Sequence, residues 1–297
     1  MTVFKAILNI IEWNRILYFS FIIFLAKYSF LYGFGFETVF SFLDTCLFTV
    51  SCIFMYAAIY LLSYYYNNKS KNIVVQNIKH LAFTVLIFAF FLGTYLSFKI
   101  NKPYFSLVYL LCFFSVLFYS KKVHEKSFTS SLIKSFTLPF TIIGLWWIDT
   151  PINLTPIQWE LFFNLQFITI IYLILSFLST LSEQLIINIS NINNDHLNKR
   201  KTLPILLGRK RAKNVAFAIM SFSAFLIVLL AMYFKNTKYL FITIIVSNLF
   251  PQLYLLYFFT KTTTNKSLKS FLKTMRYFHV FGILGIIAIA YYFKYVI

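Results

Sequence analysis

Charged residues are scarce in this sequence, and their scarcity sets its broad class. Asp, Glu, Lys and Arg make up 12% of the 297 residues, whereas 60% are hydrophobic and 22% aromatic. Soluble globular domains carry about 25% charged residues. The composition therefore excludes a soluble protein of this length and indicates an integral membrane protein.

Cysteine is scarce as well, and the three cysteines do not form a recognisable site. Cys46, Cys52 and Cys112 all fall within apolar runs and have no C-x-x-C spacing. This pattern argues against a zinc site and against a disulfide framework. The sequence also lacks a nucleotide-binding loop, a nucleophile triad and a nucleic-acid-binding module. Its N-terminal residues lack the layout of a signal peptide, so we expect no segment to be removed.

Long apolar segments follow one another along almost the whole chain. A helix needs roughly 20 apolar residues to cross the hydrocarbon layer of a membrane. Nine segments approach or exceed this length, and they leave no room for a separate soluble domain. We therefore predict an all-α, polytopic membrane protein in which residues 1–297 form a single transmembrane domain. The predicted spans are about 14–34, 38–66, 79–98, 103–120, 131–148, 160–190, 213–234, 239–260 and 275–296.

Basic residues are distributed unevenly between the two sides of these spans. With the N-terminus placed inside, 21 Lys and Arg side chains fall in inner segments and only 5 in outer ones. Because short loops rich in Lys and Arg stay in the cytoplasm, we predict a cytoplasmic N-terminus and an outer loop at 149–159, which has no cation. Lys27 lies within the first span, where we expect it to snorkel or to pair with a polar group. The most basic inner loops are 67–79, 121–130, 191–213 and 261–275.

The loop at 191–213 differs from the other basic loops in its arginine content. Three of the five arginines in the chain, Arg200, Arg209 and Arg211, lie in this loop. Arg binds phosphate through a planar pair of donors, whereas Lys would satisfy a loop that only sets topology. The loop therefore indicates a phosphorylated ligand. For the loop at 261–275 we expect only a role in topology and contact with anionic lipid headgroups.

A polar stripe leads into the 191–213 loop from the sixth predicted span. Gln184, Asn188, Asn191 and Asp195 follow one another at spacings of 4, 3 and 4, so a continuous helix would place them on one face. Glu183 lies beside this stripe. A polar stripe inside a membrane costs free energy unless it lines water or a ligand. A helix end that emerges into water would also explain the last two members, but it explains the first two less well.

The segment TLPILLG and the basic residues after it complete a family pattern. Its turn residues are Thr202, Leu203, Pro204, Leu207 and Gly208. Together with the stripe they resemble the second signature region of the UbiA family of intramembrane prenyltransferases, in which an Asp-x-x-x-Asp helix end precedes a basic loop and a Thr-Leu-Pro-x-x-Leu-Gly turn. Asp195 takes the place of the last aspartate of that pattern, and Asn191 takes the place of the first. Nine spans and an internal N-terminus extend the resemblance to the whole chain.

The resemblance implies a fold, a ligand and a reaction. It implies a ring of nine helices around a lipid-accessible cavity, a polyprenyl diphosphate held by Mg²⁺ and cations, and capture of the allylic carbon by an aromatic or other acceptor as the diphosphate leaves. A leaving diphosphate needs its growing charge neutralised, and Mg²⁺ needs oxygen ligands. The metal candidates are then Asp195 and Asn191. The diphosphate candidates are Arg15, Tyr119, Lys121, Lys122, Lys201, Arg209 and Arg211, although an Arg at the start of a span also serves as a topology anchor.

The first signature region of the family is not matched. It should carry three aspartates near the cytoplasmic end of the second span, but residues 45–124 contain no Asp or Glu. Aligned by helix end, the three positions become Ser63, Tyr66 and Ser70, and a shift of register is left open. Glu125 and Glu183 are the other carboxylates predicted on this side. With Asp195 they suffice for one metal ion but not for two adjacent ions.

Three functions remain open from the sequence. The first is a divergent prenyltransferase whose cations replace much of the role of the metal, and the second is a lipid-binding or membrane-assembly protein without catalysis. The third, a small transporter, lacks the expected inverted repeat and interrupted helices. As partners we expect membrane lipids and a polyprenyl diphosphate or related isoprenoid, and no nucleic acid. We expect a bacterial inner membrane as the location.

Overall fold

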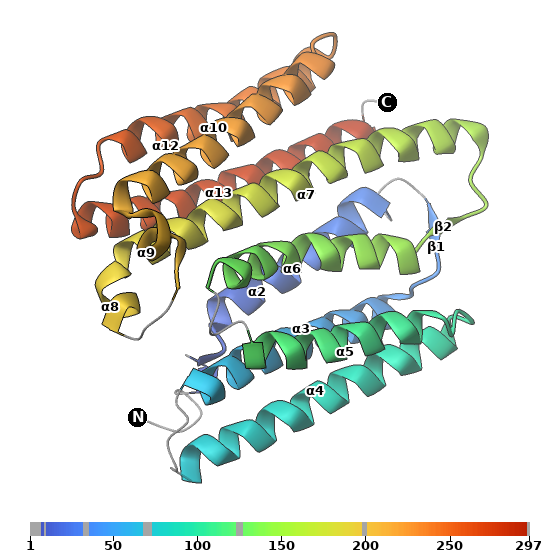
Figure 1. The fold of residues 1–297 in the computed structure, drawn as a ribbon. Coiled ribbons are helices and arrows are strands. Elements are labelled where there is room, and N and C mark those ends of the chain that lie inside the picture. Colours follow the sequence, from blue (N-terminus) through green and yellow to red (C-terminus); the bar gives the residue numbers. More distant parts are fainter. Residues whose placement is uncertain are drawn as a thin grey trace. The chain divides into compact units, whose positions relative to one another are not determined.

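Helices make up almost all of the structure, which divides into two units (Figure 1). This computed structural model describes residues 7–8, 10–31, 36–67, 73–122, 127–197 and 201–295. Unit 1 comprises the described residues of Met1–Tyr32, Glu37–Lys126 and Thr141–Asn153. Unit 2 comprises those of Gly33–Phe36, Ser127–Phe140 and Leu154–Ile297.

Unit 1 is a group of packed helices with a short pair of strands at one end. Its elements are α2 (Trp13–Leu25), the π-helix η1 (Ala26–Leu31), β1 (Glu37–Thr38), α3 (Phe42–Asn67), α4 (Ile73–Lys99), α5 (Phe105–Lys122), the last part of α6 (Ser127–Ile148) and β2 (Pro151–Ile152). β1 and β2 are antiparallel, with Glu37 opposite Ile152. Helices α3, α4 and α5 contact one another, and α2 contacts α3. Their shared core consists of Ala58, Leu61, Leu62, Ile78, Ala82, Leu86 and Val116.

Unit 2 contains the remaining helices around a second core. Its elements are the first part of α6, α7 (Pro156–Ser190), α8 (Ile192–Leu197), α9 (Leu203–Leu207), α10 (Arg209–Tyr233), α11 (Lys238–Ile244), the π-helix η3 (Ile245–Leu249), α12 (Phe250–Thr260) and α13 (Asn265–Tyr295). Helix α10 presents Ala212 and Ala216 to the core, and such small residues let membrane helices approach closely. The other buried members of this core are Met220 of α10 and residues of α7, α12 and α13.

Local capping explains where two long helices start. Helix α7 begins at Pro156, four residues before the predicted span, because Thr155 and Gln158 form a capping box around its first turn. Pro156 at the first helical position also favours this start. Helix α3 begins at Phe42 rather than at residue 38, because Thr38 lies in β1 and Ser41 Oγ accepts a hydrogen bond from Asp44 N in the first turn of the helix.

The basic loop predicted at 261–275 is mostly helical, which corrects the predicted boundary of the last span. Helix α13 starts at Asn265, after reciprocal hydrogen bonds between Thr264 and Ser267. Its first turns are amphipathic. Leu268, Phe271, Leu272 and Met275 are buried in the core of unit 2, whereas Lys266, Lys269 and Lys273 are exposed. Burial of this apolar face explains why the helix starts at Asn265, before the predicted start of the span at residue 275.

Seven helices in the described residues are long and apolar enough to cross a membrane. They correspond to all the predicted spans except the first and the fourth. In those two places the chain forms α2 with η1, and α5, whose apolar part is Phe105–Ser120. The protein is thus an all-α, polytopic membrane protein.

Candidate functional site

The TLPILLG turn forms a compact support at one end of unit 2. Its helix α9 contacts α7, α8 and α10, and Figure 1 shows it beside the start of α10. Thr202 and Pro204 are buried, and the Thr202 hydroxyl oxygen has no hydrogen-bond partner among the residues that the structure describes. Gly208 ends the turn with a φ of 85°, a conformation that suits glycine. The turn residues therefore have structural reasons to be where they are.

Exposed cations surround this turn, and we call this region the basic end of unit 2. Lys201, Arg209 and Arg211 are all exposed. Arg209 donates a hydrogen bond from Nη2 to Asn265 Oδ1 at 2.6 Å, which joins the starts of α10 and α13. Lys213 instead turns inward, where it donates to the backbone oxygen of Thr262. The first three residues thus lie at the surface, whereas Lys213 stabilises the fold.

The predicted polar stripe is interrupted. Helix α7 ends at Ser190, and Asn191 is its C-cap, so the stripe does not lie on one regular helix. The helical hydrogen-bond pattern continues through the interruption, because Asn191 N donates to Ile187 O and Asp195 N donates to Asn191 O. The surroundings of the stripe differ along its length. Gln184 and Asp195 are buried, Asn188 is half-buried with a hydrogen bond to Ser131, and Asn191 is exposed.

The carboxylates of unit 2 do not assemble into a magnesium site. Asp195 is buried at 3% exposure while Asn191 is exposed, and Glu183 forms an ion pair with Arg276 at 2.9 Å. No group of three or more His, Cys, Asp or Glu side chains suited to a metal occurs in the described part of the chain. Mg²⁺ requires several oxygen ligands. The oxygen atoms that Asp195, Asn191 and Glu183 offer therefore do not fit Mg²⁺. Glu125, the other predicted carboxylate, lies outside the described residues.

In unit 1, the candidates Arg15 and Tyr119 lie in different surroundings. Arg15 is partly exposed at the start of α2, where its Nε lies 2.7 Å from Glu12 Oε2. Tyr119 is buried on α5. The side chains of Lys121 and Lys122 lie outside the described residues, as does Ser70 of the first signature region. Ser63 and Tyr66, at the other two aspartate positions, are half-buried on α3.

Helix α7 carries a second polar stripe, which was not predicted from the sequence. Its spacing of 3, 4, 3 and 4 was a usable signal in the sequence, because it places five residues on one helical face. The members of this stripe are Thr169, Tyr172, Ser176, Ser179 and Glu183. The stripe therefore runs along a helix that is otherwise apolar.

Partners from other helices satisfy most of this second stripe. Asn248, in η3, donates to Tyr172 OH at 2.9 Å, and His279 on α13 lies 2.5 Å from Ser179 Oγ through its Nε2. The Thr169 hydroxyl oxygen is buried without a partner among the described residues. Hydrogen bonds of this kind hold membrane helices together. The stripe thus stabilises unit 2 from within.

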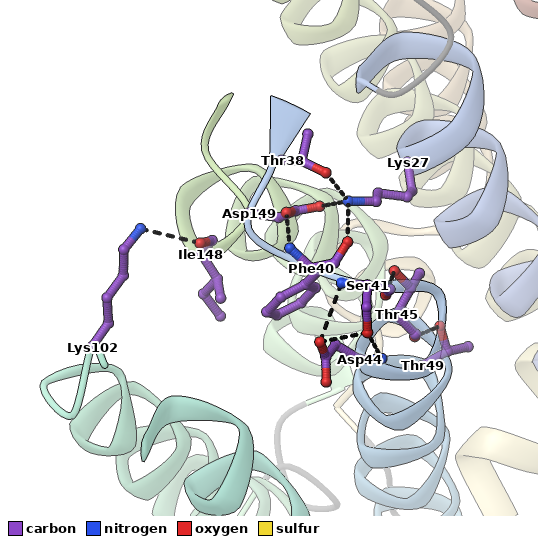
Figure 2. Close-up of polar contacts among 10 residues, drawn as sticks. All are labelled: Lys27, Thr38, Phe40, Ser41, Asp44, Thr45, Thr49, Lys102, Ile148 and Asp149. Atoms are coloured by element: carbon purple, nitrogen blue, oxygen red, sulfur yellow. Dashed lines mark hydrogen bonds and ion pairs between the residues drawn. The ribbon is translucent and has the colours of Figure 1, made fainter. Parts of the chain in front are cut away.

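The strand end of unit 1 carries a buried ion pair (Figure 2). Lys27, which is 1% exposed, donates to Asp149 Oδ2, to Thr38 Oγ1 at 2.6 Å and to the backbone oxygen of Phe40 at 3.2 Å. Asp149 Oδ1 in turn accepts from Phe40 N at 2.7 Å. The prediction that Lys27 pairs with a polar group is confirmed. Every donor of Lys27 and both oxygens of Asp149 are engaged, so this pair is structural.

A second acidic residue at the strand end is engaged in the same way. Asp44 accepts hydrogen bonds from Ser41 N at 3.1 Å and from Ser41 Oγ at 2.7 Å, and it forms an ion pair with Lys99. Ser41 Oγ also accepts a hydrogen bond from Asp44 N at 3.3 Å, so Ser41 caps the start of α3. Asp44 and Asp149 therefore stabilise the fold at the strand end of unit 1.

Comparison with known proteins identifies the fold but no family by sequence. No protein-family model matches the chain, and a search of curated proteins finds no match. The chain is similar to the solved structure of a digeranylgeranylglyceryl phosphate synthase, studied for biosynthesis in membranes. The two are 13% identical, the match covers 97% of this chain and 98% of the other, and the TM-score is 0.67. The likeness spans the whole chain and concerns the fold.

Proposed function

We propose that this protein binds a polyprenyl phosphate or diphosphate in the membrane, with its phosphate groups at the basic end of unit 2. The observation that carries the proposal is the exposed group of Lys201, Arg209 and Arg211 around the turn in which Thr202 and Pro204 are buried. In this proposal the N-terminus and the basic end face the cytoplasm, and the whole chain acts as one membrane domain with nine spanning segments.

Electrostatics at the start of α10 favour an anion there. The first residues of this helix are Arg209, Lys210 and Arg211, and its first turn has no acidic residue. The positive end of a helix dipole disfavours cations, so this cluster costs free energy unless a negative group lies near it. A phosphate offsets that cost and accepts bidentate hydrogen bonds from Arg.

The fold supports an isoprenoid as the lipid part of the ligand. The structural neighbour is named as a synthase of digeranylgeranylglyceryl phosphate, a lipid with a phosphate group. Transfer of a prenyl group to an aromatic or lipid acceptor is the second part of the proposal, and this likeness favours it. The alternative is a lipid-binding or membrane-assembly protein. The lack of a fitting magnesium site in the described residues favours that alternative.

A binding experiment with purified protein tests the proposed ligand. We expect tritiated farnesyl diphosphate to bind in detergent, with displacement by unlabelled geranylgeranyl diphosphate but not by farnesol. Replacement of Lys201, Arg209 and Arg211 by Gln should weaken binding about tenfold or more, because hydrogen bonds to charged groups contribute roughly 1.5–3 kcal/mol each. The matched control is Lys235→Gln with Lys238→Gln, two exposed lysines near the other end of α10.

Two outcomes of this experiment separate the alternatives. Unchanged affinity in the triple variant would show that the phosphate site lies elsewhere. Release of diphosphate by the wild-type protein that depends on an added aromatic or lipid acceptor and yields the prenylated acceptor, measured with or without Mg²⁺, would show transfer. Retained binding without release would identify the lipid-binding alternative.

A further inference from the structure

One exposed face of α13 is basic at its start and apolar further along. Residues at spacings of 3 and 4 lie on one side of a helix. On α13 this spacing connects three lysines to apolar residues that are all exposed as well, and we call this set the outer face of α13. Its members are Lys266, Lys269, Lys273, Tyr277, Val280 and Leu284. Basic and apolar side chains thus follow one another on the same line.

The opposite side of α13 fixes the direction of this face. That side is buried in the core of unit 2, where the helix contacts α7, α11, η3 and α12. The lysines therefore cannot turn toward the core. None of the three forms an ion pair with a residue that the structure describes, and the first turn of α13 has no acidic residue. Like charges at these spacings repel one another, so a negative group from outside the chain would stabilise the face.

The length of α13 sets the depth of its lysines in the membrane. Lys273 and Tyr291 are 18 residues apart, and both are exposed. At about 1.5 Å per residue they are separated by about 27 Å, close to the thickness of the hydrocarbon layer. Lys266 and Lys269 then lie in the headgroup layer, and Val280 and Leu284 lie beside acyl chains. Headgroup and acyl chain follow in the same order in a phospholipid.

A second copy of the chain fits the outer face poorly. Copies of a membrane protein share one orientation, so a symmetric pair has its two-fold axis along the membrane normal. Pairing through this face would bring the lysines of both copies together at the same depth, where they would repel. Membrane helices that pack tightly also use small residues. The glycines in this part of α13, Gly282 and Gly285, lie instead against Asn248 and Ser247 of η3.

We propose that the outer face of α13 binds an anionic phospholipid, with its phosphate at the three lysines and its acyl chains along Val280 and Leu284. The inference does not depend on the proposed isoprenoid site. It goes beyond the headgroup contact expected for a loop, because one helix face supplies both the cations and the surface for the acyl chains. Phosphatidylcholine carries a cation of its own and neutralises the lysines less. The face therefore selects phosphatidylglycerol over phosphatidylcholine.

Thermal unfolding of the purified protein in dodecyl maltoside tests this selection. We expect phosphatidylglycerol to raise Tm with increasing lipid concentration, since a ligand that binds only the folded protein stabilises it. Phosphatidylcholine should have little effect, and so should glycerol 1-phosphate, which has the phosphate without acyl chains. With Lys266→Gln, Lys269→Gln and Lys273→Gln together, the apparent affinity for phosphatidylglycerol should fall about tenfold or more, because each Lys near anionic lipid strengthens binding about fivefold.

The matched control is the triple variant Lys201→Gln, Arg209→Gln and Arg211→Gln. It also removes three exposed cations from unit 2, so a general effect of net charge would weaken the response to phosphatidylglycerol equally in both variants. We expect the control to keep the wild-type response. Without lipid, the lysine variant should unfold at the wild-type temperature, because the replaced side chains are exposed.

Several outcomes would overturn the inference. Equal losses in the two triple variants, an equal rise of Tm with phosphatidylcholine, or a rise with glycerol 1-phosphate would each show that the face does not select an anionic phospholipid. A dimeric mass by light scattering in detergent that Leu284→Arg reduces to a monomer would identify a second copy as the occupant. If farnesyl diphosphate does not bind while phosphatidylglycerol still acts through the lysines, the proposed function fails and this inference stands.

Discussion

Replacing Lys27 by Met should destabilise the protein by about 3–5 kcal/mol, which is the usual cost of removing one partner of a buried ion pair. Lys27 and Asp149 are 1% and 0% exposed, so water cannot replace the lost partner. The Asp149 carboxylate would keep only the hydrogen bond from Phe40 N. The measurement is unfolding of the purified protein in mixed detergent and SDS micelles, followed by far-UV circular dichroism.

A second substitution separates the charge from the packing at this position. Asn at position 149 keeps an oxygen for Phe40 N but carries no charge, so Lys27→Met with Asp149→Asn should recover most of the lost stability. Replacing a buried ion pair by neutral groups is often close to neutral. Lys235→Met, at an exposed lysine, is the control and should change stability little. A Lys27→Met protein as stable as the control would mean that the pair does not stabilise the fold.

Two glycine substitutions should have opposite effects on stability. A Cβ at Gly93 would lie 2.3 Å from ring carbons of Tyr109, so the two helices must separate or the ring must move. Overpacking of this kind costs about 1–3 kcal/mol. A Cβ at Gly144 has no atom within 4 Å. Gly144→Ala in α6 should therefore stabilise the helix by roughly 0.5–1 kcal/mol, through reduced backbone entropy of the unfolded chain.

The same unfolding measurement in micelles compares the two glycines directly. Because both changes add one methyl group to a helix, they differ only in the space that meets it. A Gly93→Ala variant as stable as Gly144→Ala would show that α4 and α5 do not approach closely at Tyr109. A smaller side chain at position 109 should recover part of the stability that Gly93→Ala loses, so the double variant Gly93→Ala with Tyr109→Leu should be more stable than Gly93→Ala alone.

The two ends of unit 1 use their carboxylates differently. At the strand end, Asp44 and Asp149 accept hydrogen bonds on both oxygens and stabilise the fold. At the other end, Glu12 is partly exposed and pairs with a cation that is also exposed. Buried and fully paired groups resist substitution because their loss leaves an uncompensated charge. We therefore expect larger losses of stability from substitutions at the strand end than from substitutions at Glu12.

The proposed transfer reaction depends on whether charged side chains can neutralise the leaving diphosphate. The fold matches over almost the whole chain, but Glu183 is paired with Arg276, Asp195 is buried, and no group of three or more His, Cys, Asp or Glu side chains suited to a metal occurs in the described residues. Cations can neutralise a leaving diphosphate in part. Whether they suffice for transfer is the question that the measurement of diphosphate release answers.

The sequence by itself determined the class of the protein, most of its spanning helices and the position of its basic end. Apolar runs, cation placement and the TLPILLG turn are local features, so they can be read without a structure. The predicted ends of the helices were less accurate. The cap formed by Thr155 with Gln158 and the amphipathic start of α13 lie outside the apolar runs from which the spans were predicted.

Only the tertiary structure decided which polar residues meet. Lys27 and Asp149 are 122 residues apart, Ser179 and His279 are 100 apart, and Glu12 lies 48 residues from Tyr60. No spacing rule connects such pairs, because they depend on how helices pack and not on the period of one helix. The absence of carboxylates from α3 beyond Asp44 was visible in the sequence, but the carboxylate that reaches it from α2 was not. Packing of α2 against α3 supplied Glu12.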